Sequence, residues 1–166
     1  MTQAILVIGC AARDHRGLDA FISELAMKSA LPIVVVAHGQ GGNASLSSAL
    51  LGCSGLPVVE VQDKAPIVPG TIYVAPFDYH VLVESGTIAL STEAPVHGAR
   101  PAIDPLFESA ADSYGESAIA VLVTDEDANN EHADGVRGLA RIRECGGVGL
   151  VQTAGAPLMH VLGGVA

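Results

Sequence analysis

Tryptophan is absent from the sequence, and aromatic residues make up only 4% of it although 49% of the residues are hydrophobic. The core therefore has to be built from aliphatic side chains, and 166 residues are enough for one domain with a full core. Basic residues are also scarce, since 8 Lys and Arg stand against 18 Asp and Glu, a net charge of -10. Because nucleic-acid affinity rests on Lys and Arg that neutralise phosphates, this balance argues against a nucleic-acid partner.

Long apolar runs and paired cysteines are missing as well. No stretch of 18 consecutive apolar residues occurs, and no basic segment leads into a hydrophobic region with a cleavage site, so we expect no membrane insertion and a cytoplasmic location. The three cysteines (Cys10, Cys53 and Cys145) lack paired metal-ligand spacing, which suits a reducing compartment. We expect neither a cofactor nor a bound metal.

The opening of the chain is its most informative stretch. Residues Ala4–Ile8 are apolar and rich in β-branched side chains, which is typical of a strand buried on both faces of a parallel sheet. Gly9 ends this strand at the kind of turn where an open α/β sheet places its ligand or catalytic groups. The position best suited to a nucleophile there is Ala11, whose side chain is a methyl group.

Strands and helices alternate along the rest of the chain. The patterns predict strands at 33–37, 57–61, 118–123 and 148–151, and helices at 17–29, 45–51, 103–114, 134–145 and after Pro157. Short strand-like runs at 71–75, 80–84 and 87–90 predict a β-hairpin or meander. The fold class expected is a three-layer α/β domain, with a mostly parallel doubly wound sheet plus an added antiparallel β-hairpin.

Several segments together resemble a known family. They are Ile8–Ala12 with Gly17–Ala20, Val35–His38, Val68–Pro76 with His80, His97–Ala111, and Asp134-Gly135 with Gly138-Leu139 and Gly146-Gly147. The stretch His97–Ala111 is the most specific of them. In these segments the chain resembles the effector domain of the bacterial chemotaxis protein-glutamate methylesterase (the CheB-type domain), along nearly its whole length.

The resemblance implies a hydrolytic triad of serine, histidine and aspartate, which removes methyl groups from glutamyl methyl esters on chemoreceptors. The histidine falls on His38 and the aspartate on Asp134, and we expect these two side chains to stay paired. The serine falls on Ala11, which has no atom that could attack an ester carbonyl. The family's function is therefore expected without its acyl-enzyme chemistry.

Two further departures from the family pattern affect the catalytic machinery. Arg13-Asp14 replaces paired glycines, and the approach to Asp134 from Thr124 is longer and acidic. The second region helps to form the family's oxyanion site, where one lost donor costs on the order of a hundredfold or more in rate. We expect a degenerate, inactive methylesterase-like domain over residues 1–166, without a receiver domain. A chemoreceptor-like or other signalling protein is the expected partner, and a separate receiver domain the possible regulator.

An alternative hypothesis keeps some hydrolysis. Cys10 could replace the serine, since a thiolate is a strong nucleophile, or His38 could activate a water with Asp134 orienting it. However, neighbouring residues of a strand point to opposite faces, which favours Cys10 as a small buried side chain turned away from Ala11. A small-ligand module in the same crevice is a third possibility.

Weaker patterns are outweighed by ordinary structural explanations. The acidic residues from Asp125 to Asp134 resemble the start of a calcium loop but lack its glycine and its closing glutamate. His15 and His132 are candidate metal ligands, but they lie in separate loops far apart in the sequence, which is weak evidence for a metal site. Gly39–Gly42 has no lysine after it, unlike a phosphate-binding loop. Arg100 could equally hold a substrate carboxylate or organise its own loop.

Overall fold

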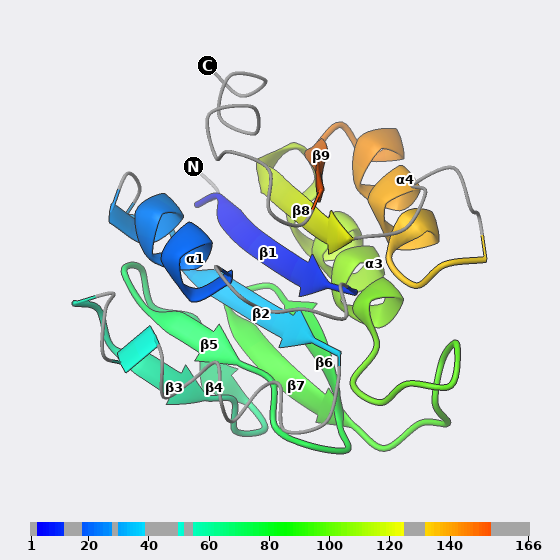
Figure 1. Cartoon of the computed structure of the whole chain (residues 1–166), viewed down its shortest axis with the longest axis horizontal. Helices are drawn as coiled ribbons and strands as arrows, with labels where there is room; N and C mark the ends of the chain where they lie inside the picture. Colours follow the sequence, from blue (N-terminus) through cyan, green and yellow to red (C-terminus); the bar gives the residue numbers. More distant parts are fainter. Residues whose placement is uncertain are drawn as a thin grey trace.

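A six-stranded sheet, parallel throughout, forms the centre of the structure (Figure 1), in the order β3-β5-β2-β1-β8-β9. The computed structural model describes residues 3–11, 18–27, 30–38, 50–51, 55–124 and 132–153. The strands are β1 (Ile5–Cys10), β2 (Ile33–Ala37), β3 (Val58–Glu60), β5 (Ile72–Val74), β8 (Ala118–Thr124) and β9 (Val148–Thr153). All their carboxyl ends therefore lie along one edge of the sheet.

The sheet is covered on both faces, which gives the three layers predicted from the sequence (Figure 1). Helix α1 (Leu18–Met27) packs on one face, where Leu18, Ile22 and Leu25 join a buried cluster. Helices α3 (Ile103–Tyr114) and α4 (Val136–Glu144) pack on the other face. Strands β1 and β2 are buried along their whole length, which explains why they contain no polar side chain.

A second sheet of three antiparallel strands, in the order β4-β7-β6, packs beside α3. It contains β4 (Ala65–Pro66), β6 (His80–Glu84) and β7 (Thr87–Ser91), and β6 and β7 form the predicted hairpin. One assignment from the sequence is wrong: the run 71–75 forms no part of this hairpin. It contains β5, which lies between β2 and β3 in the parallel sheet and is buried at all three residues.

Some predicted elements lie outside the described residues. These are the helix after Pro157 and most of the helix predicted at 45–51, of which only Leu50 and Leu51 are described. A short 3-10 helix, η1 (Gly115–Ser117), joins α3 to β8. Within the described part of the chain, every helix is too short or too polar to cross a membrane.

The start of α3 lies directly against the end of β1. A Cβ atom built on Gly9 would come within 2.3 Å of Ile103 Cγ2, at the first residue of α3. Two non-bonded carbon atoms cannot come this close. Only glycine at position 9 therefore leaves room for Ile103 at the start of α3. The close approach brings the first turn of α3 to the edge of the sheet where β1 and β2 end.

Gly9→Ala should therefore destabilise the fold by about 2 kcal/mol or more, because the added methyl group overpacks a closed contact. Urea unfolding of the two proteins measures this difference. The same substitution in an Ile103→Ala background should cost clearly less, since the clashing atoms are gone. Equal costs in both backgrounds would show that the Gly9–Ile103 contact does not limit position 9.

Candidate functional site

Ala11 and His38 lie side by side at the carboxyl edge of the central strands. Cys10 and Ala37 are register partners in the β1–β2 pair, and the His38 N–H donates to the Cys10 carbonyl at 2.9 Å. On its other side, the Ala11 N–H donates to the Val123 carbonyl of β8 at 2.8 Å. Ala11 packs against the cluster beneath α3 and α4. The methyl group at position 11 and the imidazole at position 38 thus belong to the same edge.

The imidazole of His38 is bonded to the carboxylate of Asp134. The Nε2 atom donates to Asp134 Oδ2 at 2.7 Å, and the side chains are 25% and 4% exposed respectively. The pairing predicted from the sequence is therefore confirmed as a contact. Among the described residues, no hydroxyl or thiol group hydrogen-bonds this imidazole. The pair can orient a ring and hold a proton, and Ala11, which follows β1 at the same edge, offers only a methyl group.

Asp134 also binds the first turn of α3. Its Oδ2 atom accepts the Ile103 N–H at 2.7 Å, and its Oδ1 atom accepts the Asp104 N–H at 2.9 Å. The N-cap residue of α3, Ala102, has no side chain that could do this. Burial on its own raises the pKa of Asp134, but the hydrogen bonds from His38, Ile103 and Asp104 and the His38 charge outweigh it, so the pKa lies below its ordinary value.

Asp104, in α3, binds the first turn of α4 in the same way. Its carboxylate is fully buried, and Oδ1 accepts the N–H groups of Gly135 at 3.1 Å and Gly138 at 2.7 Å. Its Oδ2 atom accepts from Nε2 of His97 at 2.7 Å. The two helices therefore cap each other, because each supplies the carboxylate that the other's first turn needs. Asp134 has a structural task here that is independent of any chemistry.

Cys10 faces the opposite side of the sheet. Its side chain is 1% exposed and belongs to the cluster beneath α1, whereas Ala11 packs on the side of α3 and α4. The expectation that the two side chains point apart is confirmed. The thiol therefore lies on the face of the sheet covered by α1, away from the face on which Ala11 packs.

A crevice opens next to the imidazole. It encloses about 220 Å³ and is lined by Ala37, His38, Phe77, Gly98, Ala99, Arg100 and Pro101. Phe77 follows β5 and is 87% exposed, so an aromatic ring stands at the mouth of the crevice. The size suits one side chain of a partner protein or a small molecule.

Arg100 organises its own loop. Its guanidinium group bonds Asp78 Oδ1 through Nε at 3.0 Å and NH2 at 2.9 Å, and NH1 donates to the carbonyls of Thr92 and Glu93 at 3.2 Å. Of the two roles considered from the sequence, the contacts favour the structural one, because a substrate carboxylate would have to compete with these acceptors.

One group of side chains has metal-ligating chemistry. Ligand atoms of His97, Asp104 and Asp134 lie within 4.8 Å of one another. Both carboxylates already accept N–H groups on each oxygen, so a metal ion would have to displace hydrogen bonds that hold α3 and α4. Of the other candidates, His15, the acidic residues 125–131 and the glycines 39–42 lie outside the described residues, and His132 is exposed.

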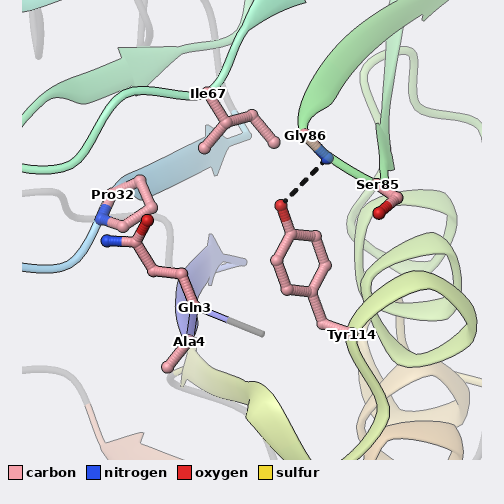
Figure 2. Close-up of a pocket in the computed structure, with 7 residues that line it drawn as sticks. All are labelled: Gln3, Ala4, Pro32, Ile67, Ser85, Gly86 and Tyr114. Carbon is pink, nitrogen blue, oxygen red and sulfur yellow. Dashed lines mark hydrogen bonds between the residues drawn. The ribbon is translucent and has the colours of Figure 1, made fainter. Parts of the chain in front are cut away.

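A second cavity, of about 180 Å³, lies at the opposite edge of the sheet (Figure 2). Its lining residues come from just before β1 and β2, the residue after β4, the β6–β7 turn and the end of α3: Gln3, Ala4, Pro32, Ile67, Ser85, Gly86 and Tyr114. The Gly86 N–H donates to the Tyr114 hydroxyl across it at 3.4 Å. None of these side chains carries a formal charge at neutral pH, and the cavity is separated from His38 by the length of the strands.

Comparison with known proteins identifies the family and the fold of the chain. The sequence matches the CheB methylesterase family over residues 6–159. The chain belongs to the CheB methylesterase family. The crystal structure of the Thermotoga maritima CheB methylesterase catalytic domain is similar with a TM-score of 0.76 and 32% identity, covering 89% of this chain and 78% of that one. The family and fold expected from the sequence are therefore confirmed.

Two curated relatives carry the name protein-glutamate methylesterase/protein-glutamine glutaminase. The protein from Symbiobacterium thermophilum is 32% identical over 162 residues, which cover 96% of this chain and 43% of the relative. Protein 1 from Rhodospirillum rubrum is 40% identical over 129 residues, which cover 73% of this chain and 31% of the relative. The chain spans less than half the length of these two relatives.

Two important residues of the site were not assigned roles from the sequence. Asp104 and His97 both fall in the stretch that resembles the family most specifically, but no role followed from that match. A signal was present in the position of Asp104, because an acidic residue in the first turn of a helix is a common partner for backbone N–H groups. Its backbone partners, Gly135 and Gly138, belong to the start of α4, a contact between separate elements that local pattern does not show.

Asp134→Asn should lower the free energy of unfolding by about 1–3 kcal/mol at neutral pH, because a carboxylate bonded to N–H groups is replaced by a weaker acceptor. The folded-state pKa of Asp134 is below its ordinary value of 3.8, so the charge-dependent part of this stabilisation is complete above that value. It should disappear as the pH falls through the lowered folded-state pKa. Urea unfolding at a series of pH values measures the difference between the two proteins.

Asp112→Asn is the matched control. Asp112 is 59% exposed and pairs with Arg141 on the surface, so its loss should change stability by less than about 0.5 kcal/mol. If the two variants behaved alike, the buried hydrogen bonds of Asp134 would not contribute to stability as described.

Cys10 should react slowly with a thiol reagent in the folded protein, because its side chain is buried beneath α1. Mass spectrometry of each cysteine-containing peptide, at about neutral pH with and without urea, measures this. Cys145 is partly exposed and gives a reference for faster labelling. Rapid labelling of Cys10 without urea would revive it as a nucleophile.

Proposed function

We propose that this protein is a non-hydrolytic member of the methylesterase family, which binds a chemoreceptor-like or other signalling protein at the crevice beside His38 without cleaving an ester. The observation that carries the proposal is the methyl group of Ala11 at the carboxyl end of β1. Acyl transfer through an enzyme ester requires an attacking oxygen or sulfur atom next to the base, and this position has neither.

The retained His38–Asp134 pair fits this proposal. An imidazole bonded to a carboxylate is usually taken as evidence for catalysis. Here the carboxylate also holds the start of α3, so substitution of Asp134 would disturb the fold whether or not the protein is an enzyme. The pair therefore supports a shaped binding site as well as it supports a reaction.

The crevice suits a protein partner. Phe77 is almost fully exposed at its mouth, and aromatic side chains are among the residues that contribute most to protein–protein affinity. The net charge of -10 favours a neutral or cationic surface on the partner. We place this interaction in the cytoplasm, since reduced Cys10 and Cys145 suit a reducing compartment, and expect any phosphorelay control to come through a separate receiver domain.

Binding can be tested with a chemoreceptor cytoplasmic fragment that carries glutamyl methyl esters. Phe77→Glu should weaken binding on the order of tenfold, as expected when an aromatic anchor is replaced by a charge. Val68→Glu is the matched control: Val68 is 49% exposed but lies on the segment that leads into β5, at the opposite edge of the sheet, and its substitution should leave the affinity unchanged. If the native protein, Phe77→Glu and Val68→Glu all bound with equal affinity, the receptor fragment would not bind at this crevice, and the proposal would fail.

Hydrolysis should be absent. The native protein should hydrolyse a nitrophenyl ester no faster than His38→Ala, and should release no methanol from the methylated fragment. A rate that depends on His38 would instead support hydrolysis by a water activated at the imidazole. Ala11→Ser should restore little activity, because the sequence leading to Asp134 also departs from the family's oxyanion region.

A further inference from the structure

A short turn forms one wall of the crevice. In this rim turn, Val96–Ala99, the N–H and carbonyl groups of Val96 and Ala99 bond each other at 3.0 and 2.9 Å, so that two residues connect the two sides. Gly98 and Ala99 face the same cavity as His38. Any movement of the rim turn changes the width of the crevice beside the imidazole.

The tip of the rim turn has an unusual backbone. His97 has a φ of +51° and Gly98 a φ of +73°, as two-residue hairpin turns of this kind require. Gly98 adopts this conformation freely, whereas a residue with a Cβ atom does so at a cost. His97 is held there by its side chain, because its Nε2 atom donates to Oδ2 of the fully buried Asp104 at 2.7 Å.

The base of the loop is fixed independently of His97. The buried imidazole of His80 accepts the Ala102 N–H on Nδ1 at 3.3 Å and donates from Nε2 to the Ala94 carbonyl at 2.9 Å. Arg100 bonds the carbonyls of Thr92 and Glu93. His80 and Arg100 thus close the loop at its base, and the Val96–Ala99 backbone bonds fix the shape of the turn. At the tip, the His97–Asp104 bond is what ties the turn to α3.

We propose that His97 is a positioning residue: its bond to Asp104 holds the rim turn against the crevice and so sets which side chains can reach His38. Asp104 is itself held in place. Its carboxylate accepts the Gly135 and Gly138 N–H groups, and its own N–H is bonded to Asp134. One connected set of hydrogen bonds therefore aligns both imidazoles. The inference rests on the proposed function only in assigning a binding role to this crevice.

The test compares variants at position 97 by the rate at which diethyl pyrocarbonate acylates His38, followed by mass spectrometry at about pH 8, where an ordinary imidazole is neutral. His97→Gly suits the positive φ of the turn but removes the hydrogen-bond donor to Asp104. The rim turn should then move away from the crevice more often, and His38 should be acylated faster, on the order of tenfold. His97→Gln keeps an N–H donor three bonds beyond Cβ and should restore a rate close to native.

Lys64→Gly is the matched control, since Lys64 also has a positive φ, of 67°, but its side chain is 67% exposed. It relieves the backbone in the same way and should leave the His38 rate unchanged. A folded His97→Gly protein with the native acylation rate and native amide resonances for Gly98 and Ala99 would overturn the proposal. Neither result depends on a partner or on ester hydrolysis, so failure here is distinct from failure of the proposed function.

The native protein provides a second measurement in case His97→Gly does not fold. Imidazole nitrogen NMR should show the His97 Nε2 proton as hydrogen-bonded and slow to exchange with water. A His97 ring whose two nitrogens share the proton in rapid exchange, as in a freely solvated imidazole, would overturn the proposal without any substitution.

Discussion

The hydrogen bonds of the Asp134 carboxylate are the interaction on which the site depends. One side chain accepts from the His38 ring and from the first two N–H groups of α3. A buried carboxylate is costly unless its oxygens are satisfied, and here helix N–H groups and an imidazole do so together. The position of α3, the orientation of His38 and the charge of Asp134 consequently depend on one another. A change in any one of them disturbs the other two.

This arrangement gives Asp134 a role in the fold that is separate from any role in chemistry. Ala11 makes none of the hydrogen bonds of Asp134 described above, so the side chain at position 11 can vary while those contacts stay in place. Replacing Asp134 would remove the cap of α3 as well. A histidine–aspartate pair is thus weak evidence for catalysis in this fold, because its carboxylate also holds the start of α3.

Much of this could be predicted from the sequence, because the relevant signals are local. Apolar, β-branched runs located the buried strands, and adjacent parallel strands necessarily bring their carboxyl ends, with Ala11 and His38, to one edge. The run 71–75 was misassigned because its neighbours in sequence form a hairpin, whereas its partners β2 and β3 are set by burial. Local pattern could not show the pairing of Asp104 with Gly138, or the partners of Arg100, because these depend on how separate elements pack.

The mutual capping of α3 and α4 has a consequence for how the protein opens. In most proteins the first turn of a helix frays on its own, at a low free-energy cost. Here neither helix can release its first turn without withdrawing a carboxylate from the other, so the two beginnings form one cooperative unit. His38 is bonded to this unit through Asp134, so the orientation of its ring is tied to a part of the molecule that opens slowly.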